Sequence, residues 1–213
     1  MSTTHSTPSH STPSIRSTTD SLLTPSERAE RLHDAQQALM GRLWEARTAD
    51  IARLDVVAGR FILTGDLDFH GPGSDRRARL DEWVAAGAEW YLDCRIESDD
   101  IAFIAEHAPH IRYIHAPTDD DGLPKDEWFD VVLTGLGDAL HDDSIGVITC
   151  HLGAHRAPSA LLRILLELGW HELDALAEIA EARPVAQVLY ATDAFQHFAL
   201  GALWGDIPSD PRR

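Results

Sequence analysis

Segments with a strand pattern alternate with segments with a helix pattern through the middle of this sequence, and this alternation limits the possible folds more than any other feature. Short apolar runs with the composition of buried strands lie at 61–63, 90–92, 111–116 and 145–149. Longer segments with helical spacing lie at 76–88, 98–109, 127–140 and through most of 156–204. Such alternation favours a largely parallel sheet covered by helices. We therefore expect one α/β domain.

The two ends of the chain differ from this middle part. Residues 1–22 are rich in Ser, Thr and Pro, and such a segment buries too little apolar surface to offset the entropy of ordering. We expect a disordered leader there. Thr24 and Pro25 have the arrangement of a helix N-terminus, and apolar residues recur after them at helical spacing. The folded domain, with this packing helix, is expected to span 23–205, and 206–213 to form a tail.

The charge of the chain restricts its partners. The 213 residues carry a formal net charge of −17, which disfavours nucleic acid and anionic membranes, because both are bound through basic patches. Two cysteines, Cys94 and Cys150, are too few for a disulfide framework. There is no apolar run of transmembrane length and no signal-peptide pattern. We expect a cytoplasmic protein without nucleic-acid or membrane partners, and its oligomeric state is left open.

The segment from Cys150 to Arg156 lies between an expected strand and an expected helix. Backbone N–H groups of such a loop form a concave anion site, and the positive end of the following helix adds to it. Arg156 brings a planar guanidinium that binds two phosphoryl oxygens at once. The same groups stabilise a thiolate at Cys150, a nucleophile below a bound phosphate. The expected phosphate-binding residues are His151, Leu152, Gly153, Ala154, His155 and Arg156. The alternative is a core cysteine followed by a surface arginine.

The run C-x-x-G-x-x-R formed by Cys150, Gly153 and Arg156 resembles the signature of the cysteine-dependent protein tyrosine phosphatase superfamily, and of its dual-specificity branch in particular. The resemblance extends from about Val57 to Phe198. It implies a single domain with a sheet of four or five strands flanked by helices, a phosphocysteine intermediate, and no metal or cofactor. It implies a phosphorylated protein as substrate, with phosphotyrosine and also phosphoserine or phosphothreonine; a small phosphomonoester is the alternative.

Expulsion of the leaving group needs a general acid, and the same carboxylate can later activate water. The resemblance implies that this acid comes from a loop that follows a strand upstream of the cysteine. Asp119, Asp120 and Asp121 occupy such a loop. Counting from Pro117 favours Asp120, and counting back from Phe129 favours Asp119. The alternative is a solvated acidic turn.

Two positions depart from the family pattern. The family usually has His before the cysteine and Ser or Thr after the arginine, and this chain has Thr149 and Ala157. Ala157 has no hydroxyl to donate to the departing thiolate, and Ser159 is left open as its substitute. A second function class therefore remains, a catalytically impaired phosphate-recognition module that binds phosphoproteins. A sulfurtransferase is disfavoured by the upstream carboxylates.

Histidines in the loop offer further charge. His151 and His155 can be positive near a phosphate at neutral pH. With Cys150 they form C-H-x-x-x-H, which lacks the paired spacing of structural zinc sites, so that no metal is expected. Cys94 is expected to face the core, with redox pairing to Cys150 as the alternative. Arg95 is expected at the edge of the sheet that carries the site, where it contacts substrate or braces the loop.

Overall fold

The computed structural model describes residues 52–68, 75–120 and 125–205, with side chains up to Gly201. All of these residues belong to one compact unit, Glu45–Arg213. The expected leader, the helix that starts at Pro25, Asp121 and the tail 206–213 lie outside the described residues. The expected domain boundaries therefore stay predictions.

Five strands form one sheet in the described part of the chain. They are β1 (Asp55–Val57), β2 (Phe61–Gly65), β3 (Ala88–Arg95), β4 (Arg112–Thr118) and β5 (Ile145–Cys150). Their order is β1-β2-β5-β3-β4, and β1 runs antiparallel to β2 while the other neighbours are parallel. The expected mostly parallel sheet is confirmed. Strand β1 was not expected, because an exposed Val56 between two buried residues is too short a pattern to stand out.

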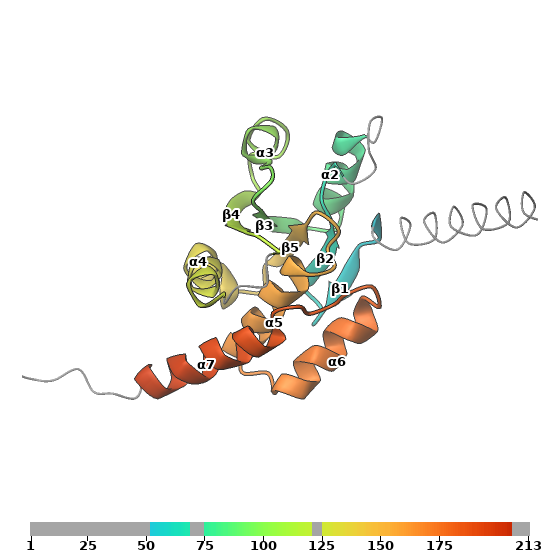
Figure 1. Cartoon of the computed structure of the whole chain (residues 1–213). Helices are drawn as coiled ribbons and strands as arrows, with labels where there is room; N and C mark the ends of the chain where they lie inside the picture. Colours follow the sequence, from blue (N-terminus) through green and yellow to red (C-terminus); the bar gives the residue numbers. More distant parts are fainter. Residues whose placement is uncertain (1–51, 69–74, 121–124, 206–213) are drawn as a thin grey trace, which may run out of the picture. The chain divides into compact units, whose positions relative to one another are not determined.

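Helices cover both faces of this sheet. They are α2 (Arg76–Ala85), α3 (Ile101–His107), α4 (Asp126–Leu136), α5 (Arg156–Glu167), α6 (Glu172–Ala182) and α7 (Ala191–Gly205), and a short 3-10 helix, η2 (Gly137–Leu140), follows α4. Helices α2 and α3 pack on one face, and α4 to α7 pack on the other (Figure 1). None of these described helices combines the length and the hydrophobicity needed to cross a membrane.

Adjacent strand residues supply the two apolar layers. Ile62, Tyr91 and Val147 pack with α2 and α3, whereas their neighbours Leu63, Leu92 and Ile148 pack with the helices of the other face. Side chains alternate between faces along a strand, so a sheet covered on both sides needs apolar residues at successive positions. This is why the strands read as continuous apolar runs.

Helix ends account for most differences from the expected elements. The expected helix 76–88 ends at Ala85, since Gly87 has a φ of +86°, outside the right-handed helical region, and β3 begins directly after it. The expected helix 127–140 ends at Leu136 and continues as η2, and the segment 156–204 divides into α5, α6 and α7.

The middle of the sheet leads directly into the most buried helix. β5 lies between β2 and β3, and every residue of α5 from Arg156 to Leu166 is buried. Its polar residues Arg156, Ser159 and Arg163 recur at helical spacing and are buried together with its apolar residues. The loop between β5 and α5 is therefore held by the centre of the fold.

Candidate active site

Cys150 ends the central strand, at the edge of the sheet where the carboxyl ends of the parallel strands meet. It is 2% exposed. A five-residue turn follows, and α5 begins at Arg156. Strand, loop and helix thus follow one another as the sequence indicated, and this is the edge at which open α/β sheets bind ligands.

The carbonyl groups of the loop are all held by residues outside it. The His151 carbonyl accepts a hydrogen bond from the Asp66 amide at 3.3 Å, and the Ala154 carbonyl accepts one from the Gln187 amide at 2.6 Å. The carbonyls of Leu152 and Gly153 accept hydrogen bonds from the Arg183 guanidinium at 3.0 and 2.7 Å. The His155 carbonyl accepts one from the Ser159 hydroxyl at 2.8 Å. In a trans peptide the C=O and the next N–H point in opposite directions. Apart from the Gly153 amide, which donates to the Cys150 carbonyl at 3.3 Å, the loop amides are therefore turned to the concave side, an arrangement that binds anions.

Arg183 holds two of these carbonyls from the end of α6. Its side chain is fully buried and donates to Leu152 and Gly153 while it forms an ion pair with Asp55, 2.7 Å between Nη1 and Oδ2. Burial lowers the pKa of Arg183, and Asp55 opposes this effect. The planar fork of arginine suits this position, because it donates in several directions at once.

Gly153 is required by the path of the loop. Its φ is +60°, a conformation that other residues rarely adopt, and a Cβ at this position would lie 2.2 Å from the carbonyl oxygen of Thr64. The loop therefore passes so close to β2 that only glycine fits. The path of the loop therefore explains why the central residue of the motif is glycine.

The Arg156 guanidinium is fixed by Glu97, the second residue after β3. Nη1 and Nη2 donate to the two carboxylate oxygens at 2.7 and 2.8 Å, and Nη1 also donates to the Thr118 carbonyl at 3.0 Å. The hydrogen bonds from Arg156 lower the pKa of Glu97 to about 2. Burial alone would lower the pKa of Arg156, but the hydrogen bonds to Glu97 raise it overall.

One nitrogen of this guanidinium remains unsatisfied. Nε of Arg156 is buried and has no hydrogen-bond partner among the described residues, and an oxygen of Asp120 lies 3.5 Å from it. A buried N–H without an acceptor is unfavourable. An oxyanion bound in front of the loop can supply the missing acceptor.

A cavity of about 190 Å³ lies against the loop. It is lined by Glu97, Asp120, Cys150, His151, Leu152, His155 and Arg156. Asp120 is thus brought beside Cys150 and Arg156. Asp119 is exposed and its carbonyl accepts a hydrogen bond from the Tyr190 hydroxyl at 3.1 Å, and it does not line the cavity. Of Asp119 and Asp120, Asp120 is therefore the one that lines the cavity, while Asp121 lies outside the described residues.

The structure also places the residues that depart from the family pattern. The Thr149 hydroxyl lies 3.0 Å from the Tyr91 hydroxyl, and Ala157 is fully buried at the start of α5. The Ser159 hydroxyl donates to His155 O at 2.8 Å and accepts from the Tyr190 amide at 3.2 Å. The Ser159 hydroxyl is thus engaged both as a donor and as an acceptor, in holding the loop and the segment before α7.

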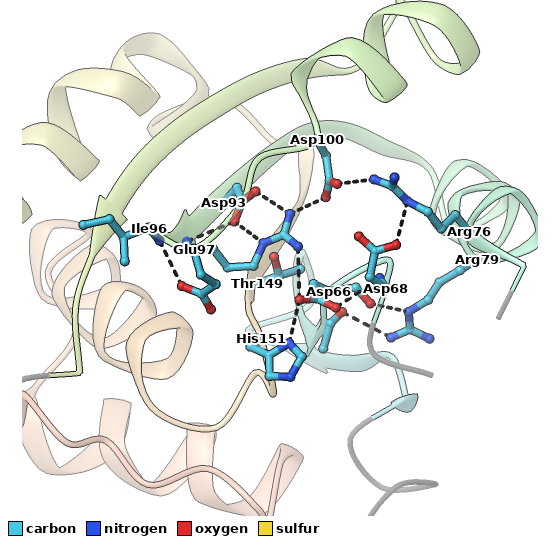
Figure 2. A network of polar contacts seen from close by, with 12 residues as sticks. Asp66, Asp68, Arg76, Arg79, Asp93, Ile96, Glu97, Asp100, Thr149 and His151 are labelled. Atoms are coloured by element: carbon cyan, nitrogen blue, oxygen red, sulfur yellow. Dashed lines mark hydrogen bonds and ion pairs between the residues drawn. The ribbon is translucent and has the colours of Figure 1, made fainter. Parts of the chain in front are cut away.

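A network of buried charges lies behind the loop (Figure 2). The Arg95 guanidinium, 1% exposed, contacts three carboxylates, those of Asp66, Asp93 and Asp100. Asp66 in turn binds His151, 2.9 Å between Oδ2 and Nδ1. Arg95 therefore braces the loop through Asp66 and does not line the cavity, which decides between the two roles expected for it.

The second cysteine is part of the core. Cys94 is fully buried in the same apolar cluster as Cys150, and neither forms a disulfide. Burial raises the pKa of Cys94 well above its usual value, so that its thiol stays protonated. Among the described residues no three His, Cys, Asp or Glu side chains are grouped as metal ligands.

Three residues that hold the site were missed by sequence reasoning: Asp66, Glu97 and Arg183. Their contacts with the loop and with Arg156 span sequence separations of 85, 59 and 30 residues. Asp66 and Glu97 are acidic residues that follow β2 and β3 at the carboxyl edge of the sheet. The rule that selected Asp119, Asp120 and Asp121, an acid just after a strand, also applies to them.

No family model matches this chain, and no curated protein matches its sequence. Solved structures do match. A mouse putative dual specificity phosphatase complexed with zinc tungstate is 17% identical, with 72% of this chain and 91% of that chain covered and a TM-score of 0.57. Human DUSP28 is 17% identical, with 71% and 95% covered and a TM-score of 0.55. Tk-PTP in its active form is 18% identical, with 68% and 95% covered and a TM-score of 0.53. At such identities the similarity establishes the fold.

Proposed function

We propose that this chain, which has the fold of the dual-specificity phosphatases, hydrolyses phosphomonoesters through a phosphocysteine intermediate on Cys150. The proposed substrates are phosphorylated proteins, with phosphotyrosine and also phosphoserine or phosphothreonine. The observation that carries the proposal is the combination at one cavity of a cysteine, a loop whose carbonyls are all held from outside, and the unsatisfied Nε of Arg156.

In the proposed first step, the loop amides and Arg156 bind the phosphoryl oxygens, and the Cys150 thiolate attacks phosphorus. The bond from phosphorus to the ester oxygen breaks, and Asp120 gives its proton to that oxygen. In the second step, water attacks the phosphocysteine and gives a proton to the Asp120 carboxylate, while the thiolate departs with the electron pair of the S–P bond. Atoms and charges balance without a metal or cofactor.

A second candidate function is phosphate recognition without turnover. It is favoured by Ala157, which has no hydroxyl, and by the engagement of the nearby Ser159 hydroxyl in two other hydrogen bonds. In that case Cys150 would be trapped as a stable phosphoenzyme or would not react. The loop and Arg156 would serve both candidates equally, so binding alone does not separate them.

The test is hydrolysis of a generic aryl phosphate by the wild-type chain and by Cys150→Ser. We expect turnover by the wild type and none by the variant, together with tungstate binding by both, because the serine leaves the loop amides in place. Hydrolysis by Cys150→Ser at the wild-type rate would refute the proposed mechanism. Tungstate binding without hydrolysis by either protein would support the recognition module.

A further inference from the structure

The candidate cavity holds little positive charge for a dianion. Both Nη atoms of Arg156 are bound to Glu97, and Asp120 lies 3.5 Å from its Nε. One guanidinium is therefore faced by two carboxylates before a phosphoryl group brings further negative charge. Of the other lining side chains, His151 and His155 are those that can become cations.

His151 is oriented by a carboxylate outside the cavity. Its Nδ1 lies 2.9 Å from Oδ2 of Asp66, and the Asp66 amide donates to the His151 carbonyl at 3.3 Å. An ionised carboxylate only accepts hydrogen bonds, so Nδ1 of His151 carries the proton in this contact. The ring is thereby fixed at the lip of the cavity, 54% exposed, and Figure 2 shows it extending from the loop toward Asp66.

Asp66 lies outside the cavity, and its charge is partly offset by the Arg95 guanidinium, which it shares with Asp93 and Asp100. Its Oδ2 lies 3.1 Å from Nη1 of Arg95, and both side chains are almost fully buried. A proton gained by His151 therefore adds positive charge on the side of the cavity. His155 differs, because its Nδ1 lies 3.6 Å from Asp120, an acidic side chain that itself lines the cavity.

We propose that the His151 side chain, oriented by Asp66, takes part in ligand binding in addition to the loop amides, and that its imidazolium form contacts the bound phosphoryl dianion. The proposal rests on the function proposed above. Charged and titratable groups that face His151 or the cavity come from every surrounding element. Among the described residues they include Asp66 and Arg95 behind the ring, Glu97 after β3, Asp120 before α4, and Cys150, His155 and Arg156 of the loop and α5. Tight binding of a dianion then requires a proton on His151, and affinity falls as the pH rises.

The experiment measures tungstate affinity by calorimetry on the full chain carrying Cys150→Ser, which removes titration of the thiol. Histidine ordinarily changes charge within the range from about pH 6 to about pH 8. As the pH rises through this range, we expect the tungstate affinity of the Cys150→Ser parent to fall by about tenfold, because one charge-assisted hydrogen bond is lost. Addition of His151→Gln, whose amide can still donate to Asp66, should remove most of this pH dependence and weaken binding at the acid end by about tenfold.

Two further variants serve as a control for His151→Gln and as a test of the role of Asp66. His110→Gln, at an exposed position on the described surface, is the matched control and should bind as the parent does. Asp66→Asn removes the carboxylate that orients the ring, so tungstate binding at the acid end should weaken relative to the parent. If Asp66→Asn does not fold, the comparison between His151→Gln and the parent still decides.

Identical affinity and pH dependence in the parent and in His151→Gln would overturn the proposal, and so would a parent that does not bind tungstate. Neither result depends on turnover. The proposed phosphatase activity fails on a different observation, hydrolysis that survives Cys150→Ser, so the two failures are distinguishable.

Discussion

Ala157 bears on which half of the proposed reaction is slow. It is fully buried at the first turn of α5, the position at which the family resemblance implies a hydroxyl that donates to the departing thiolate in the proposed second step. Introduction of Ala157→Ser should therefore accelerate breakdown of the phosphocysteine by about tenfold or more, the equivalent of one hydrogen bond to a charged group. Rapid mixing with an aryl phosphate should show a burst of aryl alcohol in the wild type and a smaller burst in the variant.

Ala160→Ser provides the matched control, since it places the same hydroxyl at another fully buried position of α5. It should leave the burst unchanged. A wild type without a burst, together with an unchanged steady-state rate in Ala157→Ser, would mean that breakdown of the phosphocysteine is not rate-limiting.

Helix α6 contributes to the site through the residue at its end. Arg183 holds the carbonyls of Leu152 and Gly153, so Arg183→Lys keeps the charge near Asp55 but leaves at least one buried carbonyl without its donor. We expect a loss of about 1–3 kcal/mol in the free energy of unfolding and a weaker affinity for tungstate. Urea denaturation and calorimetry measure the two effects.

Arg77→Lys on α2 is the control for this change, because Arg77 is half exposed and pairs with Asp81 on the surface; both quantities should stay at their wild-type values. If Arg183→Lys bound tungstate as tightly as the wild type does, the loop would keep its shape without the hydrogen bonds from the Arg183 guanidinium.

The elements could largely be predicted from the sequence, whereas their contacts could not. The apolar runs at 61–63 and 145–149 indicated β2 and β5 because strands buried on both faces are apolar at successive positions. The motif placed Cys150 and Arg156 correctly between a strand and a helix. The partners Asp66 and Glu97 depend on the order of the strands, which places β2 and β3 on either side of β5, and no local pattern encodes that order.

At the scale of the whole domain, low pH should weaken the ion pair between Glu97, which follows β3, and Arg156, which begins α5. The pKa of Glu97 is lowered from 4.5 to about 2 by Arg156. A lowered pKa in the folded state means that Glu97 stabilises the fold above the unfolded value, and that this contribution is lost as the pH falls through the folded value. The difference in the free energy of unfolding between the wild type and Glu97→Gln should therefore be constant near neutral pH and shrink between about pH 4.5 and about pH 2.

Urea denaturation at a series of pH values measures this difference. The exposed Glu181→Gln, on α6, is the control, and it should show little difference from the wild type at any pH. If the difference in the free energy of unfolding between Glu97→Gln and the wild type stays unchanged down to about pH 2, ionisation of Glu97 is not the cause of that difference.

The hydrogen bonds that hold the loop carbonyls from outside the loop also have a consequence for synthesis of the chain. Proteins emerge from the ribosome with their N-terminal part first, so Cys150 emerges before Arg183 and Gln187, which hold three of the five carbonyls from outside. A nascent chain that already contains β5 and the whole signature therefore still lacks the groups that turn its amides inward. The proposed affinity for phosphate should therefore arise only when the segment after α6 has emerged and docked, so that ligand binding would distinguish a finished domain from one that is still being made.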